Sequence, residues 1–187
     1  QAFGFPAGRI HVVPPGIDPG FLQDSCAGRS PVLRVLTVAR LSSSNRRKNV
    51  DSLIEAIRLL GHELAISLVI VGTGDDRPRL ARLVEALGLE SRVSLLGEVS
   101  SDELRRVYRE SDLFALVVRP DPSDVEGYGM TYVEAAGAGV PVIATDTGGV
   151  AEAVRDGVTG LFAHDPSPAG IAEAIMRFLR GRARFDA

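Results

Sequence analysis

The sequence predicts an α/β fold in which helices cover both faces of a doubly wound parallel sheet. Two observations lead to this prediction. Short runs rich in Val, Ile and Leu alternate with longer amphipathic stretches along most of the 187 residues. The short runs are apolar almost throughout, which is typical of strands that are buried on both faces. Strand–helix–strand repetition at this spacing then favours a doubly wound sheet.

Seven apolar runs are predicted as strands, namely Ile10–Val13, Leu33–Ala39, Ile66–Val71, Val93–Leu96, Leu113–Val118, Val140–Ala144 and Leu161–Ala163. Six amphipathic segments are predicted as helices, namely Asn49–Leu60, Pro78–Leu87, Ser101–Glu110, Thr131–Ala138, Val150–Arg155 and Ser167–Leu179. Apolar residues recur at intervals of three or four in these segments, as on the buried face of a helix. Ser100 and its neighbours offer capping groups before Ser101.

The chain divides into three parts. Residues 1–30 are rich in Gly and Pro and are interpreted as an interdomain segment with the first strand. Residues 31–181 form the sheet domain, and residues 182–187 lack a pattern and are predicted to fray. Because the sequence begins at Gln1 and not at Met, we expect it to be part of a longer chain.

Composition excludes several classes of protein. Hydrophobic residues make up 45% and charged residues 24%, which is ordinary for a soluble globular domain. A net charge of −3 argues against a nucleic-acid partner. The single cysteine, Cys26, excludes an internal disulfide and fits a reducing, cytoplasmic compartment. No apolar run approaches the length of about 20 residues that spans a bilayer, and the beginning of the chain does not resemble a signal peptide.

Ligands of doubly wound sheets bind at the carboxyl ends of the strands, so the loops there are the first candidates. The loop from Ala39 to Asn49 holds four cations within nine residues: Arg40, Arg46, Arg47 and Lys48. Arginine forks and a lysine charge beside a helix N-terminus suit a diphosphate. A solvated basic loop is the alternative that local charge leaves open.

A second loop runs from Val125 to Glu134 and also leads from a strand into a helix. Its glycines, Gly127 and Gly129, let the backbone approach a ligand closely. The amides of Met130 and Thr131 are expected to face an anion or sugar hydroxyls. Glu126 and Glu134 suit hydroxyl recognition because each carboxylate oxygen accepts a hydrogen bond. The alternative is a structural helix start with two solvated glutamates.

Other polar features are interpreted as structural. Gly72-Thr73-Gly74 lacks the third glycine of a dinucleotide fingerprint and is predicted to be a tight turn. Gly148-Gly149 is expected to make another turn, with Glu152 as a cap or, less favoured, a ligand contact. Asp121 and Asp124 have no His or Cys nearby, so no metal site is expected. The three histidines are interpreted as structural or solvated, and Cys26 lacks a local base.

A loop suited to phosphates and a loop suited to hydroxyls leave the same predicted edge, and a nucleotide sugar carries both groups. Here the sequence resembles the C-terminal, Rossmann-like domain of GT-B glycosyltransferases of family 4, the group 1 transferases. The resemblance covers nearly the whole chain, and the Glu-x7-Glu element is its most specific part. The matching segments are His11–Asp18, Val38–Leu41, Arg47–Asn49, Val69–Gly74, Val93–Gly97, Glu126–Ala135, Gly139–Ala144 and Gly148–Glu152.

The resemblance implies residue roles. Arg40 and Lys48 bind the donor diphosphate and stabilise the leaving nucleotide. Because the stretch from Arg40 to Lys48 is slightly longer than the family pattern, Arg47 is expected to share or take over the cation role. Glu134 accepts from the ribose hydroxyls. The donor sugar is held by Glu126 together with Gly127, Tyr128, Gly129, Met130 and Thr131. The base pocket is lined by Val93, Leu95 and Gly97.

The resemblance further implies a retaining transfer of a hexosyl group to a glycan or lipid-linked acceptor, without a cofactor or obligatory metal. Fixed cations can neutralise a departing diphosphate in place of a divalent ion. An N-terminal GT-B domain of the same polypeptide is the expected partner, so this chain alone is predicted to be inactive. Association with the inner face of the cytoplasmic membrane would come through that domain. The Asp124–Gly129 stretch gives a slight preference for GDP-mannose.

Two alternative functions stay open, and two others are disfavoured. A GT-B sugar-nucleotide epimerase would share this half of the fold. A non-catalytic nucleotide-binding module would keep the fold without needing to pair Glu126 with Glu134. A dinucleotide dehydrogenase is disfavoured by the missing fingerprint, and a phosphorylase by the lack of a cofactor lysine site.

Overall fold

The computed structural model describes residues 11, 13, 15–22, 30–44, 46–121 and 127–185. Six strands form one sheet in the order β3-β2-β1-β4-β5-β6, and every neighbouring pair is parallel. The strands are β1 (Leu33–Val38), β2 (Ile66–Val71), β3 (Val93–Gly97), β4 (Leu113–Leu116), β5 (Val142–Ala144) and β6 (Gly160–Phe162). The order reverses between β1 and β4, so the predicted doubly wound sheet is confirmed.

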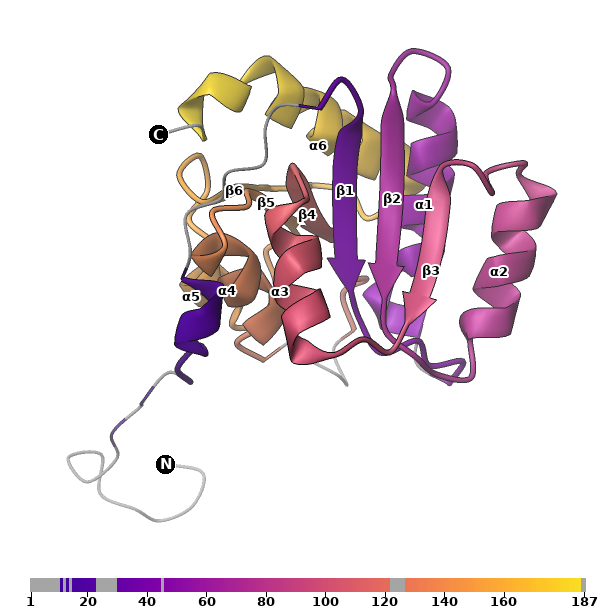
Figure 1. Cartoon of the computed structure of the whole chain (residues 1–187). Coiled ribbons are helices and arrows are strands. Elements are labelled where there is room, and N and C mark those ends of the chain that lie inside the picture. The colour runs from indigo at the N-terminus through magenta and orange to yellow at the C-terminus, as the bar shows by residue number, and fades with distance from the viewer. Residues whose placement is uncertain are drawn as a thin grey trace.

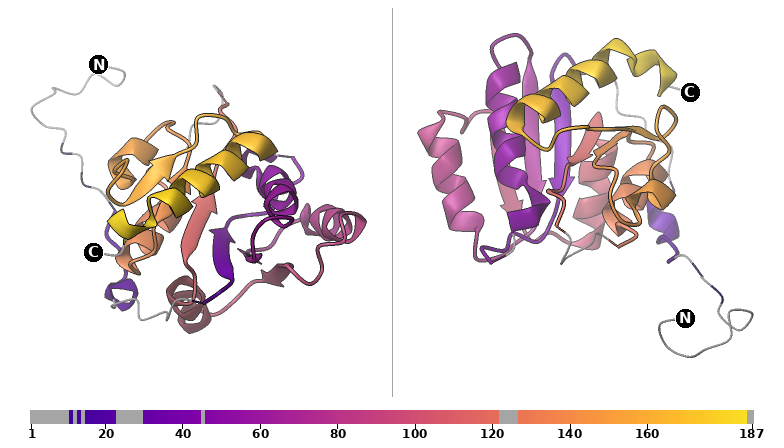
Figure 2. Two further views of the ribbon diagram at one scale, coloured as in Figure 1. Left: turned by 90° about the horizontal axis from the view of Figure 1, so that it is seen from above. Right: turned by 180° about the vertical axis from the view of Figure 1, so that it is seen from behind.

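Helices cover both faces of this sheet. They are α1 (Val50–Leu60), α2 (Arg77–Ala86), α3 (Ser101–Arg109), α4 (Met130–Gly137), α5 (Val150–Ala153) and α6 (Pro168–Arg180). Figures 1 and 2 show α1 and α6 together on one face and α3 and α4 on the other. Because all the strands are parallel, their carboxyl ends share one edge, here called the carboxyl edge, toward which the arrowheads of β1, β2 and β3 point in Figure 1.

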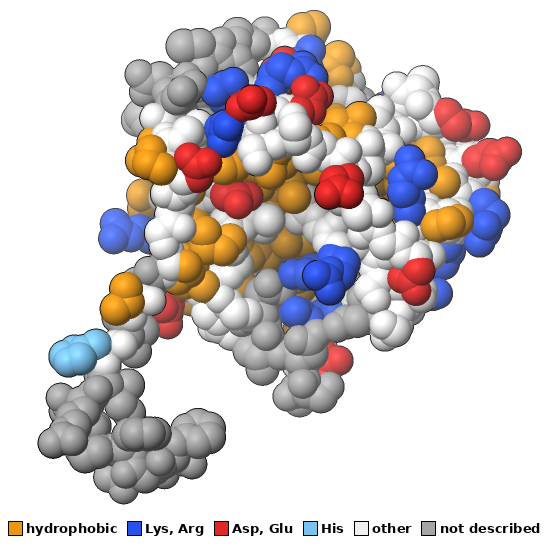
Figure 3. Space-filling model, turned by 60° about the horizontal axis from the view of Figure 1, so that its bottom comes forward, with side chains coloured by type: hydrophobic (Ala, Val, Ile, Leu, Met, Phe, Trp, Pro, Cys, Tyr) orange, Lys and Arg blue, Asp and Glu red, His pale blue; other side chains and the backbone are white. Residues whose placement is uncertain are grey.

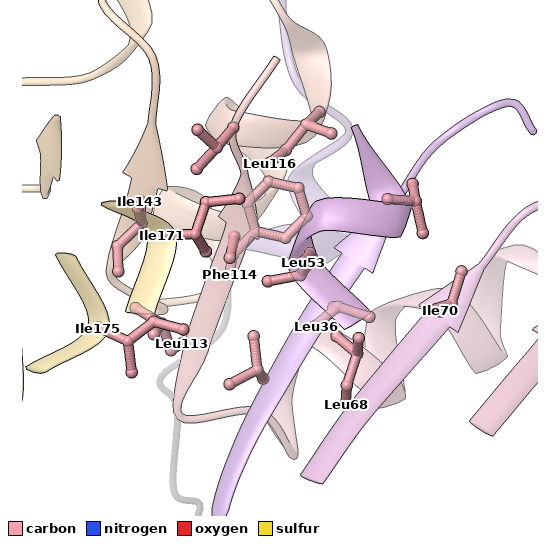
Figure 4. Packing of buried hydrophobic residues seen from close by; sticks show 14 of the residues in the cluster. Leu36, Leu53, Leu68, Ile70, Leu113, Phe114, Leu116, Ile143, Ile171 and Ile175 are labelled. Atoms are coloured by element: carbon pink, nitrogen blue, oxygen red, sulfur yellow. The ribbon is translucent and has the colours of Figure 1, made fainter. Parts of the chain in front are cut away.

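The hydrophobic core fills both faces of the sheet, under α1 and α6 on one side and under α3 and α4 on the other. Leu36, Leu68 and Phe114 of the sheet are fully buried, and Figure 4 shows Ile175 of α6 near Leu113. The ring of Phe114 packs against those of Tyr108 in α3 and Tyr132 in α4, with centroids 5.8 and 5.9 Å apart. The predicted apolar face of α1 is buried as expected. Burial of each such side chain contributes roughly 1.5–3 kcal/mol to folding. This core fixes the strands and thereby the loops that leave the carboxyl edge.

Capping side chains set the start of two helices. The Ser100 hydroxyl accepts from the amide of Glu103 at 3.2 Å, as the sequence predicts for the helix that follows. The Ser167 hydroxyl accepts from the amide of Gly170 in the same way, also at 3.2 Å. Each bond satisfies an amide that has no partner inside its own helix.

Several element boundaries differ from the prediction. The fifth strand begins at Val142 and not at Val140, because Pro141 has no amide hydrogen to donate to a neighbouring strand. The predicted strand Ile10–Val13 lies partly outside the described residues, and His11 and Val13 are not in a strand. The short helix after Gly149 ends at Ala153, since Val154 is already extended.

The last residues also differ from the expected frayed tail. Residues Arg182–Arg184 form a 3-10 turn, and the ring of Phe185 packs on that of Phe178 with centroids 5.6 Å apart. Arg182 pairs with Asp112 at 2.6 Å, which ties this turn to the sheet. Residues 186 and 187 lie outside the described part of the chain. Within the described residues, no helix combines the length and apolar composition needed for a membrane span.

Candidate functional site

The carboxyl edge brings together the loops that carry most of the predicted site residues. The loop after β1 reaches residue 49, and α4 begins near the carboxyl end of the neighbouring strand β4. Figure 3 shows this side of the molecule, where basic side chains lie beside an apolar, hollowed area. The topological switch between β1 and β4 lies between the two loops, which is where such sheets bind ligands.

Three of the predicted cations line one cavity. Arg40, Arg47 and Lys48, with Ser42, surround a cavity of about 180 Å³, here called the basic hollow. Arg40 is exposed, and Arg47 and Lys48 are half-buried members of a 3-10 turn, Arg46–Lys48. Cations that converge on one hollow suit a polyanionic group. In a simply solvated loop, which is the alternative, the cations would not need to converge.

Asn49 fixes the end of the basic loop. Its backbone is left-handed, with φ of 56°, and the residue is only 2% exposed. Its side-chain amide donates to the carbonyl of Val117 at 3.0 Å and to that of Pro166 at 2.7 Å. Asparagine tolerates this backbone conformation better than most residues. Asn49 was predicted only as the first residue of a helix, and its two anchoring hydrogen bonds were not predicted.

The Gly72-Thr73-Gly74 turn supports the other side of the basic loop. A Cβ on Gly72 would lie 1.9 Å from the carbonyl oxygen of Ala39, and one on Gly74 would lie 2.0 Å from that of Leu41. These glycines therefore serve close backbone packing, and the prediction of a structural turn is confirmed. Asp75 accepts from the amide of Ser43 at 2.8 Å and from its hydroxyl, and these bonds lower the pKa of Asp75.

Arg119 holds the turn Arg46–Lys48 from the side of the sheet. Its backbone amide donates to the carbonyl of Arg47 at 2.8 Å, and its guanidinium donates to the carbonyl of Arg46 at 3.0 Å. The same guanidinium pairs with Asp51 at 3.0 Å. Sequence reasoning missed Arg119, although a charged residue directly after an apolar strand marks the carboxyl edge.

The second predicted loop leads into α4. Gly129 caps this helix with φ of 72°, and Met130 and Thr131 form its first turn, where backbone amides lack partners within the helix. Gly127 is exposed and Tyr128 is half-buried. Glu126 lies outside the described residues, as does most of the Asp121–Asp124 stretch. Among the residues that are described, no three acidic, His or Cys side chains gather as a metal site.

Glu134 is held by a buried tyrosine. The Tyr108 hydroxyl donates to Glu134 Oε2 at 2.9 Å and to the carbonyl of Thr131 at 3.3 Å. The ring of Tyr108 is fully buried, and this burial, with the neighbouring carboxylate, strongly raises the Tyr108 pKa. The phenol therefore stays protonated and acts as a donor. One oxygen of Glu134 is fixed, which orients the other for a further donor.

The Gly148-Gly149 turn packs directly on the second loop. A Cβ on Gly149 would lie 2.8 Å from the carbonyl oxygen of Gly127. Gly149 thus lets the loop after β5 approach the backbone of residues 127 and 128, and the predicted turn is confirmed. Glu152 is exposed in the first turn of α5. Its negative charge complements the amides there, as expected for its structural role.

The predicted base-pocket residues separate in the structure. Gly97 ends β3 at the carboxyl edge with φ of 77°, and Leu95 lies in the strand with its carbonyl accepting from Arg77 at 3.1 Å. Val93 begins β3 at the opposite end, and its side chain belongs to the core. The five residues of β3 separate its two ends by about 13 Å, so Gly97 lies at the carboxyl edge and Val93 does not, and the base-pocket role of these residues stays a prediction.

The family model described as "Glycosyl transferases group 1" matches residues 31–186. A curated relative, the GDP-mannose-dependent alpha-(1-6)-phosphatidylinositol monomannoside mannosyltransferase of Mycobacterium tuberculosis, is 34% identical over 193 residues. That match covers 98% of this chain and 50% of the relative, so this chain spans about half the length of the relative.

Solved structures share the fold. HepE of Anabaena, in complex with UDP and glucose, is 25% identical with a TM-score of 0.69, over 83% of this chain and 41% of that chain. The C-terminal domain of a group 1 glycosyl transferase, LpcC of Francisella tularensis, is 20% identical with a TM-score of 0.70. This second match covers 91% of both chains, so a separate domain of about this extent has the same fold.

Proposed function

Because this chain belongs to the glycosyl transferases group 1 family, we propose that it is the donor-binding half of a retaining GT-B glycosyltransferase. The donor is a nucleoside diphosphate sugar, and a hexosyl group is transferred to a glycan or lipid-linked acceptor. The single observation that carries this proposal is the basic hollow, where three cations converge at the carboxyl edge.

The cations have a defined task in such a transfer. Arg40, Arg47 and Lys48 bind the diphosphate and neutralise the charge that grows on it as the bond to the sugar breaks. Fixed cations of this kind stabilise the transition state without reorganisation, and they make a divalent metal dispensable. Arginine adds bidentate geometry, whereas lysine adds a point charge.

The α4 side of the site recognises hydroxyl groups. Glu134 accepts from the ribose hydroxyls, and its fixed hydrogen bond from Tyr108 supports this role. The donor sugar lies against the backbone from Gly127 to Thr131, and Glu126 contributes to the same contact. Leu95 and Gly97 line the base pocket at the end of β3.

The identity of the donor is the finer part of the proposal. GDP-mannose is preferred slightly, and the name of the Mycobacterium tuberculosis relative supports this preference. HepE, bound to UDP and glucose, represents the other base within the same fold. We further propose that the whole enzyme works at the inner face of the cytoplasmic membrane, through the N-terminal GT-B domain, and that this chain alone transfers nothing.

Calorimetric titration of the 187-residue chain with GDP, UDP and ADP, without divalent metal, tests the proposal. One nucleotide is expected to bind selectively, and Glu134→Ala is expected to weaken it about tenfold, as for a lost hydrogen bond to a charged group. Glu173→Ala, at an exposed glutamate of α6, is the control and leaves the affinity unchanged. Absence of binding by all three nucleotides contradicts the donor-binding role.

A further inference from the structure

We infer that Arg119 is a positioning residue that holds the turn Arg46–Lys48 in the geometry needed to bind the donor diphosphate. This inference rests on the proposed function. It starts from two hydrogen bonds: the backbone amide and the guanidinium of Arg119 donate to the carbonyls of Arg47 and Arg46, at 2.8 and 3.0 Å. Arg119 follows β4, the strand next to β1, so the sheet itself anchors the turn.

A closed circuit of ion pairs runs from Arg119 back to the same turn. Arg119 pairs with Asp51 at 3.0 Å, and the other oxygen of Asp51 lies 3.4 Å from Arg79. Arg79 holds Asp76 through two bonds of 2.6 and 2.7 Å. Asp76 in turn lies 3.6 Å from the guanidinium of Arg46, which closes the circuit. Both ends of Arg46, its carbonyl and its side chain, are therefore tied to one network.

The two acidic side chains of this network are largely buried. The side chain of Asp76 is 6% exposed and that of Asp51 is 17% exposed. Arg79 lowers the pKa of Asp76 and the pKa of Arg79 is raised in return, so both partners stay charged. The side chains of Arg119 and Arg46 are 41% and 49% exposed, so the shielded aspartates are the fixed points from which these two arginines are held.

The geometry requires an arginine at position 119. One guanidinium reaches the Arg46 carbonyl through Nη1, and Asp51 and the Ser52 hydroxyl through Nη2, the latter at 3.1 Å. A lysine ammonium has no planar fork and reaches fewer of these acceptors at once. Because Asp51 already balances the charge of Arg119, its effect on a diphosphate passes through the turn that carries Arg47 and Lys48.

Binding experiments separate positioning from charge. In the 187-residue chain, Arg119→Met is expected to weaken binding of the selected nucleoside diphosphate about tenfold, as a displaced contact does, and to leave the parent nucleoside within about twofold. Arg119→Lys is expected to give an intermediate loss. Asp51→Asn provides the sharpest sign: removing a carboxylate near the hollow would tighten diphosphate binding if charge alone acted, whereas positioning predicts weaker binding.

A matched control lies at the other end of the same strand. Arg182→Met breaks the ion pair with Asp112, which directly precedes β4, and is expected to lower stability without changing the preference for diphosphate over nucleoside. Hydrogen exchange of the ligand-free protein gives a second readout. The amides of residues 46–50 are expected to exchange faster in Arg119→Met and unchanged in Arg182→Met.

The outcomes distinguish this inference from the proposed function. A wild-type chain that binds no nucleotide contradicts the proposed function, while exchange at residues 46–50 still tests whether Arg119 orders the turn. A wild-type chain that binds, with Arg119→Met equal to it, overturns the role of Arg119 alone. Equal losses for nucleoside and diphosphate, or tighter diphosphate binding by Asp51→Asn, overturn it as well.

Discussion

Replacing Gly149 by alanine probes how closely the loop after β5 supports the second site loop. Gly149 has φ of −84°, which any L residue adopts, so the added methyl group causes no backbone strain. Its Cβ would instead lie 2.8 Å from the carbonyl oxygen of Gly127 and 3.4 Å from the amide nitrogen of Tyr128. The perturbation is therefore steric and falls on the peptide that we propose holds the donor sugar.

The size of the effect follows from this distance. Ordinary contacts of a Cβ begin at 3.4 Å, so one of the two backbones must move by about 0.6 Å. Overpacking of this kind costs about 1–3 kcal/mol of stability. A shift of this size in a ligand-facing peptide is expected to weaken the contribution of the sugar about tenfold, or about 1.4 kcal/mol.

Calorimetry with GDP-mannose and GDP, and with UDP-glucose and UDP, measures that contribution as a ratio. The ratio is the dissociation constant of the nucleoside diphosphate divided by that of the nucleotide sugar. Gly149→Ala is expected to reduce the ratio while the diphosphate alone binds within about twofold of wild type. Gly181→Ala is the matched control, because its φ is −106° and its Cβ would meet no atom closer than 3.6 Å. The reasoning is refuted if the two alanine variants have the same stability and the same ratio.

Three further changes test the supports of the site. Asp76→Asn is expected to lower the free energy of unfolding by about 2 kcal/mol at pH 7, between the values for exposed and buried ion pairs. Arg79 lowers the pKa of Asp76 in the folded protein below 3.8, so this stability is fully present above pH 3.8 and is lost as the pH falls further. Urea unfolding should therefore show a difference in unfolding free energy between wild type and Asp76→Asn that shrinks below pH 3.8. A difference that stays constant with pH contradicts the ion pair. Tyr108→Phe keeps the buried ring but removes the hydrogen-bond donor to Glu134. It is expected to cost about 1.5–3 kcal/mol of stability and to weaken nucleotide binding less than Glu134→Ala does. Unchanged denaturation and unchanged affinity would show that the Tyr108 hydroxyl contributes to neither. Asn49→Gly accepts the left-handed backbone but loses two hydrogen bonds to carbonyls, and is expected to destabilise by about 2 kcal/mol in thermal unfolding, where a neutral result would deny the side chain its anchoring role.

Much of the fold could be predicted because local patterns agree with the tertiary structure. The run Leu33–Ala39 is apolar except for Arg34 and Thr37, and β1 lies in the middle of the sheet with neighbours on both sides. The spacing of Leu53, Ile54 and Ile57 predicts the buried face of α1. Such agreement between sequence pattern and burial is what makes a parallel sheet predictable from sequence.

The parts of the site that escaped prediction depend on contacts between distant loops. Arg119 and Asp51 are 68 residues apart, and they meet because β4 pairs with β1. Apolar periodicity indicates which segments are strands but does not give their order in the sheet. Arg182 and Asp112, 70 residues apart, were hidden for the same reason, and so the last turn was expected to fray.

Val93 shows a different limit of prediction from sequence. The resemblance assigned a whole strand, Val93 to Gly97, to the base pocket, and only its end lies at the carboxyl edge. Strand geometry alone, at about 3.3 Å per residue, separates the two ends. Placing each residue along the predicted strand separates Gly97, at the carboxyl edge, from Val93, at the opposite end.

The central claim, that a donor diphosphate binds at the carboxyl edge between the turn Arg46–Lys48 and the start of α4, is tested most directly by NMR. The backbone amides of the isotope-labelled 187-residue chain are followed while the selected nucleoside diphosphate is added. The account predicts shifts concentrated at residues 46–50 and 127–134, with a smaller group near Gly97. Shifts confined to residues 175–185, in the last part of α6 and the turn after it, or no shifts at saturating nucleotide, would contradict it.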